Sequence, residues 1–176
     1  MRGAEEDRFR QFAADVMPWL TRTATLLAGD RHRGDDLVQE ALVKAFVKWR
    51  HVRAADDSRA YLRGILVRCA IDAGRAPHRR ETAVGSAGDL LLDRPAPGGG
   101  GYAVHDREPL VAALAQLPPR QRAVLVLRFL EDLDVASTAT ALGVTTGTVK
   151  STTHDALRAV RALLPGVGLN REGGQA

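Results

Sequence analysis

Hydrophobic residues recur at helical spacing through the first part of the chain, where three helices are predicted. The first contains Pro18, and the loss of a backbone donor there favours a bend. The second begins near Asp35, where carboxylates suit the positive end of a helix dipole, and runs to about Trp49. The third follows a polar connection over residues 51–57 and is capped by Ser58. The three apolar stripes are Phe9, Phe12, Val16, Trp19, Leu20 and Leu27; Leu37, Val38, Ala41, Leu42, Ala45 and Phe46; and Tyr61, Leu62, Ile65, Leu66, Cys69 and Ala70.

Shorter helices are predicted in the last third of the chain, over residues 110–117, 120–130, 135–142 and 146–164. Asp134 and Thr145 supply side-chain oxygens that cap the last two, and Gly143 ends the helix between them. The expected inward positions are Val124, Leu125, Leu127 and Phe129 in the second of these helices, and Val149, Thr153, Ala156, Leu157, Val160 and Leu164 in the last. The pattern predicts an all-α fold.

The segment between the two helical blocks, residues 76–107, has the composition of a flexible linker. Nine of its 32 residues are Gly or Pro, and few apolar side chains are available to fold it. Fully stretched it spans roughly 100 Å, more than two touching domains require. We therefore expect two small helical domains, at residues 5–75 and 108–164, joined by this linker and followed by a disordered tail at 165–176.

The last two predicted helices have the arrangement of a helix-turn-helix, in which the second helix lays its outer face in the major groove of DNA. Ala139 and Val149 provide a small residue and an apolar anchor on either side of the turn. Lys150 can neutralise a phosphate, and His154 can reach a base edge. The candidate DNA contacts are Thr146, Thr148, Lys150, Ser151, His154, Asp155 and Arg158. An ordinary helical hairpin with a solvated face has the same pattern, so other stretches must decide between them.

Charge is distributed unevenly along the chain. The net charge of +4 permits an anionic partner without requiring one. Residues 48–80 hold nine Lys or Arg against three Asp, whereas residues 35–40 hold three carboxylates and no base. The first domain is therefore expected to have one basic surface and one acidic surface.

Other chemistry finds little support in the sequence. Cys69 is the sole cysteine, which excludes an intramolecular disulfide, and the histidines lack the spacing of a zinc or metalloprotease site. The glycine run at 98–101 lacks the Lys-Ser/Thr of a phosphate loop. No apolar signal segment or membrane-spanning run is present. We expect a soluble, cytoplasmic protein that is not an enzyme and has no cofactor, no metal site and no membrane partner.

Two stretches resemble the sigma-70 family of RNA polymerase sigma factors. Residues 35–42 (DDLVQEAL) are similar to that family's core-polymerase-binding helix. Residues 128–134 (RFLEDLD), followed by 141–151 (ALGVTTGTVKS), are similar to its promoter −35-binding domain. The two-domain length resembles the extracytoplasmic-function (ECF) group, and residues 26–32 (LLAGDRH) resemble an actinobacterial, sigma-E-like subgroup of it.

The resemblance implies partners and roles. The first domain would correspond to sigma region 2 and the second to sigma region 4. The second helix would dock on a coiled coil of the largest subunit of core RNA polymerase, through Asp36, Leu37, Gln39, Glu40, Leu42 and Val43. The basic segment would meet the promoter −10 element through Arg59, Arg63, Arg68 and Arg75. Further partners would be the −35 element of promoter DNA, the polymerase flap region and an anti-sigma factor. Taken alone, the acidic helix face is more simply a solvated surface. The alternative for the arginines is surface charge that keeps the domain soluble.

Two positions depart from the family pattern. Arg68 stands where the family usually has an asparagine that helps hold a flipped −10 base, so the specific hydrogen bonds of an amide are missing. Asp155 stands where an arginine typically faces DNA, and its carboxylate repels phosphate although it can accept from cytosine N4. These changes leave the family resemblance intact and bear on which promoters are chosen.

Two other classes of function compete with this interpretation. A stand-alone helix-turn-helix regulator, whose first domain senses a ligand or dimerises, would bind DNA without polymerase. A structural adaptor would show no salt-dependent DNA binding. Co-purification with core polymerase and promoter-specific initiation distinguish a sigma factor from both.

Overall fold

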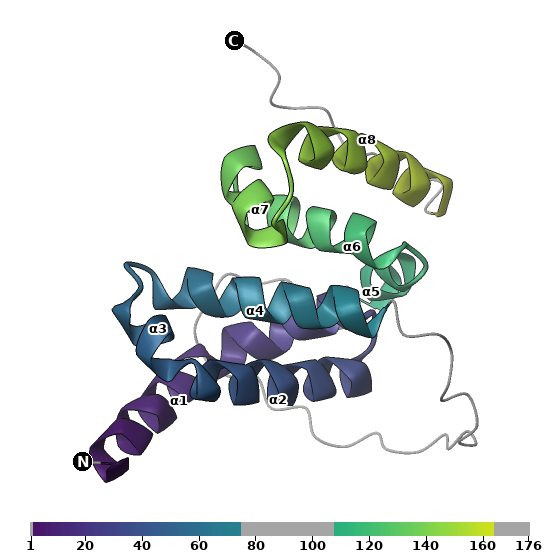
Figure 1. Ribbon diagram of the computed structural model, residues 1–176. Helices are drawn as coiled ribbons and strands as arrows, with labels where there is room; N and C mark the ends of the chain where they lie inside the picture. The colour runs from purple at the N-terminus through teal and green to yellow at the C-terminus, as the bar shows by residue number, and fades with distance from the viewer. Residues whose placement is uncertain (1, 75–107, 164–176) are drawn as a thin grey trace, which may run out of the picture.

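Residues 2–74 and 108–163 are described by a computed structural model, and the regular elements within them are all helical (Figure 1). The first block contains α1 (Arg2–Ala28), α2 (Arg31–Val47), α3 (Trp49–Ala54) and α4 (Ser58–Ala73). The second contains α5 (Glu108–Ala115), α6 (Pro119–Leu125), the π-helical turn η2 (Val126–Leu130), α7 (Val135–Leu142) and α8 (Thr146–Leu163). The all-α prediction is confirmed. The predicted linker and tail, with Arg75 and Leu164, lie outside the described residues.

The start of α2 differs from the prediction by about one turn. The cap is Asp30, whose side chain accepts a hydrogen bond from the backbone N–H of Arg33 at 2.8 Å. The helix therefore begins before Asp35, because the carboxylate of Asp30 already satisfies an amide of its first turn. Preceding it, α1 continues through Pro18 without interruption as a helix of 27 residues.

The connection predicted at residues 51–57 is in part the short helix α3. The cap of α4 is Asp57, which accepts from the N–H of Ala60 at 2.9 Å, rather than the neighbouring Ser58. The hydroxyl of Ser58 instead donates to the carbonyl of Val52 at 2.8 Å and ties α3 to the start of α4. Adjacent Asp and Ser are both good caps, so composition alone did not separate them.

The single helix predicted over residues 120–130 changes its winding at Val126. In η2 the N–H of Glu131 donates to the carbonyl of Val126 at 2.9 Å, five residues back. A π-helical turn rotates less per residue than an α-helix, so later side chains leave the inward face. Phe129, predicted to point inward, is consequently 55% exposed.

One hydrophobic core runs through both blocks. Fully buried Leu20, Leu62 and Leu66 from the first block belong to the same cluster as Leu114 and Leu127 from the second. Figure 1 shows α6 and α7 above α4, and contacts join α4 to both. The two domains are thus docked on one another through a common core.

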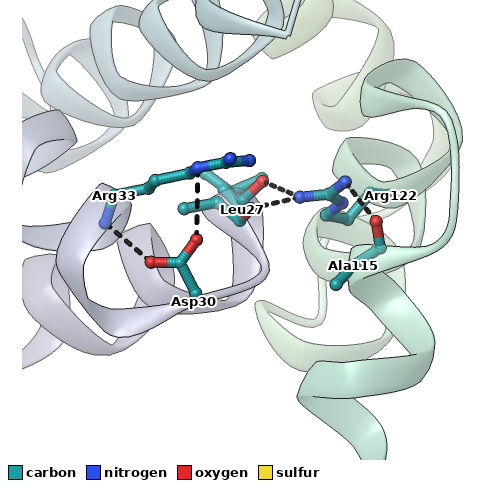
Figure 2. Close-up of polar contacts among 6 residues, drawn as sticks. Leu27, Asp30, Arg33, Ala115 and Arg122 are labelled. Atoms are coloured by element: carbon teal, nitrogen blue, oxygen red, sulfur yellow. Dashed lines mark hydrogen bonds and ion pairs between the residues drawn. The ribbon is translucent and has the colours of Figure 1, made fainter. Parts of the chain in front are cut away.

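A buried arginine bridges the two blocks at the ends of α1 and α5 (Figure 2). The guanidinium of Arg122 donates to the carbonyls of Leu27 and Ala28 in α1 and to those of Ala115 and Leu117 in the second block. Burial lowers the pKa of Arg122, nearby Arg33 lowers it further, and Asp30 opposes both. Helix ends leave carbonyls without intrahelical partners, and this one side chain supplies donors to two such ends.

The close approach beside Arg122 depends on Gly29. Its φ of +82° lies in the left-handed region that favours glycine. A β-carbon at this position would lie 2.8 Å from atoms of Ala115 and Arg122. Gly29 therefore both ends α1 and leaves room for the second block.

Candidate nucleic-acid interface

The helix-turn-helix is built by local capping at three predicted positions. Asp134 accepts from the N–H of Ser137 at 2.6 Å, and this hydrogen bond lowers the pKa of the Asp134 carboxyl. Gly143 adopts φ +64° at the end of α7. Thr145 caps α8 by accepting from the N–H of Thr148 at 3.2 Å. The predicted caps and turn are confirmed.

Apolar side chains fix how α8 lies against its neighbours. Val149 is fully buried and clusters with Val124 and Ala139. Further along the helix, Ala156 and Val160 enter the core shared by both blocks. These anchors occupy one side of α8, so the opposite side faces solvent.

The candidate DNA contacts of this motif share that solvent-facing side. All seven are exposed, namely Thr146, Thr148, Lys150, Ser151, His154, Asp155 and Arg158. Two of them form an ion pair, because Arg158 Nη2 lies 3.2 Å from Asp155 Oδ1. The aspartate that departs from the family pattern therefore neutralises an arginine on the same surface.

The candidate −10 contacts lie along α4 beside an indole ring. The guanidinium carbons of Arg59 and Arg63 lie 4.4 and 5.7 Å from the centre of the Trp19 ring. Arg59 is exposed, but the side chain of Arg63 is only 13% exposed. Stacking on an indole holds a guanidinium flat and favours its positive charge.

Arg68 lies further along α4 and faces the helix-turn-helix. A β-carbon on Gly64 would be 3.5 Å from Arg68 Nη2, so the arginine folds back along its own helix. It lines a crevice of about 170 Å³ together with Asp72 of α4 and Thr148 and Thr152 of α8. The crevice thus brings together Arg68 and Thr148, which the sequence assigned to different promoter elements.

Glu131 is a contact between the two blocks that the sequence analysis did not predict. It follows η2, and its side chain is 6% exposed with Arg63 Nε 3.5 Å from Oε2. The same carboxylate accepts from Trp19 Nε1 at 2.7 Å and from the Thr23 hydroxyl at 2.8 Å. These partners lie more than 60 positions away along the chain, so no local pattern indicated them.

The predicted polymerase-binding face lies on α2. Asp36, Gln39, Glu40 and Val43 are exposed and Leu42 is half-buried. Leu37, predicted as a contact, is 5% exposed and belongs to the core, so that assignment is wrong. It lies on the side of α2 that packs on the rest of the domain, where its apolar side chain leaves water.

Two apolar residues extend this face. Phe46, predicted to point inward, is exposed, and Val47 is 78% exposed. Val47 follows Val43 by four residues, and this spacing places both on one helix face. The spacing could therefore have added Val47 to the predicted face. The ring of Phe46 meets Phe9 edge-on, with centroids 5.0 Å apart, and so joins α1 to α2.

Glu40 of this face pairs with Lys44, which also lies near the single cysteine. Lys44 Nζ lies 2.6 Å from Glu40 Oε1 and 3.5 Å from Cys69 Sγ, and the bond to Glu40 raises the pKa of Lys44. Burial is the main cause that raises the pKa of the Cys69 thiol. The thiol is buried, as its apolar helix face predicted, and a raised pKa disfavours the reactive thiolate.

The two helical blocks match the profiles of a known protein family. The family profile for sigma-70 region 2 matches residues 12–81, and that for sigma-70 region 4 matches residues 107–160. The RNA polymerase sigma-E factor of Streptomyces avermitilis is 33% identical, over 87% of this chain and 83% of the relative. The ECF RNA polymerase sigma factor SigL of Mycobacterium tuberculosis is 35% identical, over 86% of each chain. The chain belongs to the sigma-70 family.

It is an ECF-type RNA polymerase sigma factor, a protein of transcription initiation. The described fold is also similar to a solved sigma factor, RpoE of Bartonella quintana, with a TM-score of 0.62. That likeness covers 91% of this chain and 98% of the other at 23% identity, and that protein was solved with the anti-sigma factor NepR.

Among residues 2–74 and 108–163, no three His, Cys, Asp or Glu side chains gather to hold a metal ion. Within the same ranges, each helix is too short or too polar to cross a membrane.

Proposed function

We propose that the two domains of this sigma factor bind different parts of the polymerase and the promoter. Residues 5–75 bind core polymerase and the −10 element, and residues 108–164 bind the −35 element. The observation that carries the proposal is the two-sidedness of α8. Its apolar residues are buried while all seven candidate DNA contacts are exposed, as a helix entering the major groove requires.

The exposed side of α8 offers two distinct kinds of contact. Lys150 and Arg158 carry the charge that neutralises phosphates. Ser151, His154 and Asp155 have short side chains that distinguish bases at close range. The exposed hydroxyls of Thr146 and Thr148 lie in the first turn, where the helix dipole favours an approaching phosphate.

On the first domain, the α2 face is assigned to the coiled coil of the largest polymerase subunit. Exposed Asp36, Gln39 and Glu40 stand beside exposed Val43 and Val47. A large apolar group rimmed by polar side chains is typical of a protein interface. The flap region of the polymerase is assigned to the second domain.

Transcription in vitro tests the function directly. Core polymerase with this chain should initiate at a defined subset of a randomised promoter library, and core alone should not. The competing stand-alone regulator would bind those sequences tightly without core and would not support initiation.

Disruption of the α2 face tests the polymerase assignment. Gln39→Ala with Glu40→Lys should reduce co-purification with core, while circular dichroism remains helical. The matched control Glu6→Lys reverses a charge in the exposed first turns of α1 and should bind core normally. Equal retention of both variants on core would show that the polymerase docks elsewhere.

The remaining assignments follow from this function. A protein that acts on polymerase and chromosomal promoters works in the cytoplasm, and its contribution is binding rather than catalysis, without a cofactor. An anti-sigma factor is a further partner, supported by the similar fold of a sigma factor solved with one.

A further inference from the structure

Glu131 is a buried carboxylate of the second domain whose described partners all lie in the first. Its two oxygens accept from Trp19 Nε1 and the Thr23 hydroxyl, and Arg63 supplies the opposite charge. Thr23 is fully buried and Trp19 nearly so. A carboxylate is costly to bury unless it is paired and hydrogen-bonded, so this geometry belongs to the docked arrangement of the two domains.

The place that Glu131 occupies has the chemistry of an anion-binding site. Arg59 and Arg63 lie over the Trp19 ring, and the indole N–H points at the carboxylate. A guanidinium, an N–H and a hydroxyl that converge on one oxyanion would bind a phosphate group equally well. Arg63 Nε makes no hydrogen bond within the described residues, so the pair with Glu131 is an ion pair at 3.5 Å that leaves donor capacity unused.

From this geometry we infer that Glu131 is an intramolecular stand-in for a backbone phosphate of single-stranded −10 DNA. The docked chain is then a closed state, in which the second domain covers Arg63. Domain docking and −10 strand binding exclude one another at this side chain. The inference rests on the proposed assignment of Arg63 to the −10 element.

The thermodynamic consequence is a competition between docking and DNA. If only the open form binds the −10 strand, the apparent affinity is reduced by the fraction of chains that are open. By linkage, the strand must also shift the chain toward the open form. The free chain should therefore bind the −10 strand weakly, and weakening of the Glu131 contact should raise the affinity.

The test is binding of a fluorescent single-stranded −10 oligonucleotide to the full chain, together with small-angle X-ray scattering of the free chain. Glu131→Gln keeps the shape of the side chain but loses the charge that pairs with Arg63. We expect a larger radius of gyration and an affinity increased by about tenfold. Asp132→Asn is the matched control, since it removes the same charge at the next, exposed residue, and asparagine tolerates its φ of +50°.

A second variant reaches the same contact from the other domain. Thr23→Val is nearly isosteric, removes one hydrogen bond to Glu131 and leaves every candidate DNA contact in place. It should also expand the chain and raise the affinity. Circular dichroism of each variant confirms that the helices are intact.

The outcomes separate this inference from the assignment on which it rests. If Glu131→Gln changes neither the radius of gyration nor the affinity relative to Asp132→Asn, the closed state is wrong, whatever Arg63 binds. If the chain expands and Glu131→Gln with Arg63→Gln binds the strand as tightly as Glu131→Gln alone, Arg63 is no DNA contact. That result overturns the competition together with the −10 assignment of Arg63. If Glu131→Gln increases both the radius of gyration and the affinity, and the double variant loses the gain in affinity, the closed state and the −10 assignment of Arg63 are both supported.

Discussion

At the scale of single residues, the ion pair between Asp155 and Arg158 bears on promoter choice. Arg158 Nη2 lies 3.2 Å from the Asp155 carboxylate on the exposed side of α8. Exposed pairs of this kind add little stability, so the pair matters for what the two groups can bind. While it persists, Arg158 is partly neutralised and Asp155 presents a free acceptor to a base edge.

Asp155→Arg should change which −35 sequences are selected. The substitution removes the acceptor and frees Arg158, and each altered base contact costs about 1–3 kcal/mol. Selection on randomised −35 elements with the reconstituted polymerase reads this out. An unchanged consensus would show that Asp155 faces solvent in the promoter complex.

Lys150→Ala tests the other kind of contact on the same helix. Lys150 is exposed near the start of α8, and its ammonium suits a phosphate better than a base. Initiation should weaken similarly at all target promoters. The slope of log affinity against log salt concentration should decrease by about the amount that one neutralised phosphate contributes. A loss confined to some −35 sequences would instead assign Lys150 to a base.

At the scale of elements, we expect the cap of α7 to make part of the helix-turn-helix sensitive to acid. The hydrogen bond from Ser137 lowers the pKa of Asp134 in the folded state. A group with a lowered folded pKa contributes stability that is present above its unfolded pKa and is lost as the pH falls. Asp134→Asn retains a capping oxygen that does not titrate.

The melting temperature of this variant should therefore fall less than that of the wild type between pH 6 and roughly pH 3, near the bottom of the ordinary carboxyl range. Asp134→Ala, which cannot cap, should melt at a lower temperature than both near neutral pH. Parallel curves for wild type and Asp134→Asn would mean that the cap does not contribute to acid sensitivity.

The elements that the sequence predicted correctly are those determined by neighbouring residues. Asp134, Gly143 and Thr145 were each recognisable from their position beside an apolar-periodic segment. The exposed position of Phe129 could not be predicted in this way. It results from the π-helical turn, and no clear pattern of residues marks such a change of winding. Glu131 and Arg122 were also missed as interdomain contacts. Trp19 lies 112 positions from Glu131, and Leu27 lies 95 positions from Arg122, so no periodic pattern in the sequence connects them.

At the scale of the whole molecule, the docked arrangement has a second polar anchor besides Glu131. Arg122, in the second domain, donates to the carbonyls at the end of α1 in the first domain. It also donates to the carbonyls of Ala115 and Leu117 in its own domain. Its position is independent of the candidate −10 contacts. A change at Arg122 therefore weakens docking without removing any candidate DNA contact.

Arg122→Lys should uncouple the two domains. Lysine keeps the charge, but its compact ammonium cannot reach four carbonyls on two helix ends, so about 2–3 kcal/mol of coupling is lost. Heating should then resolve two unfolding transitions, whereas one is expected for the wild type, and the radius of gyration should increase. Arg120→Lys, at an exposed position of the same helix, is the control and should behave as wild type. A single transition at an unchanged temperature for Arg122→Lys would mean that apolar contacts alone hold the domains together. The shared core would then outweigh this guanidinium.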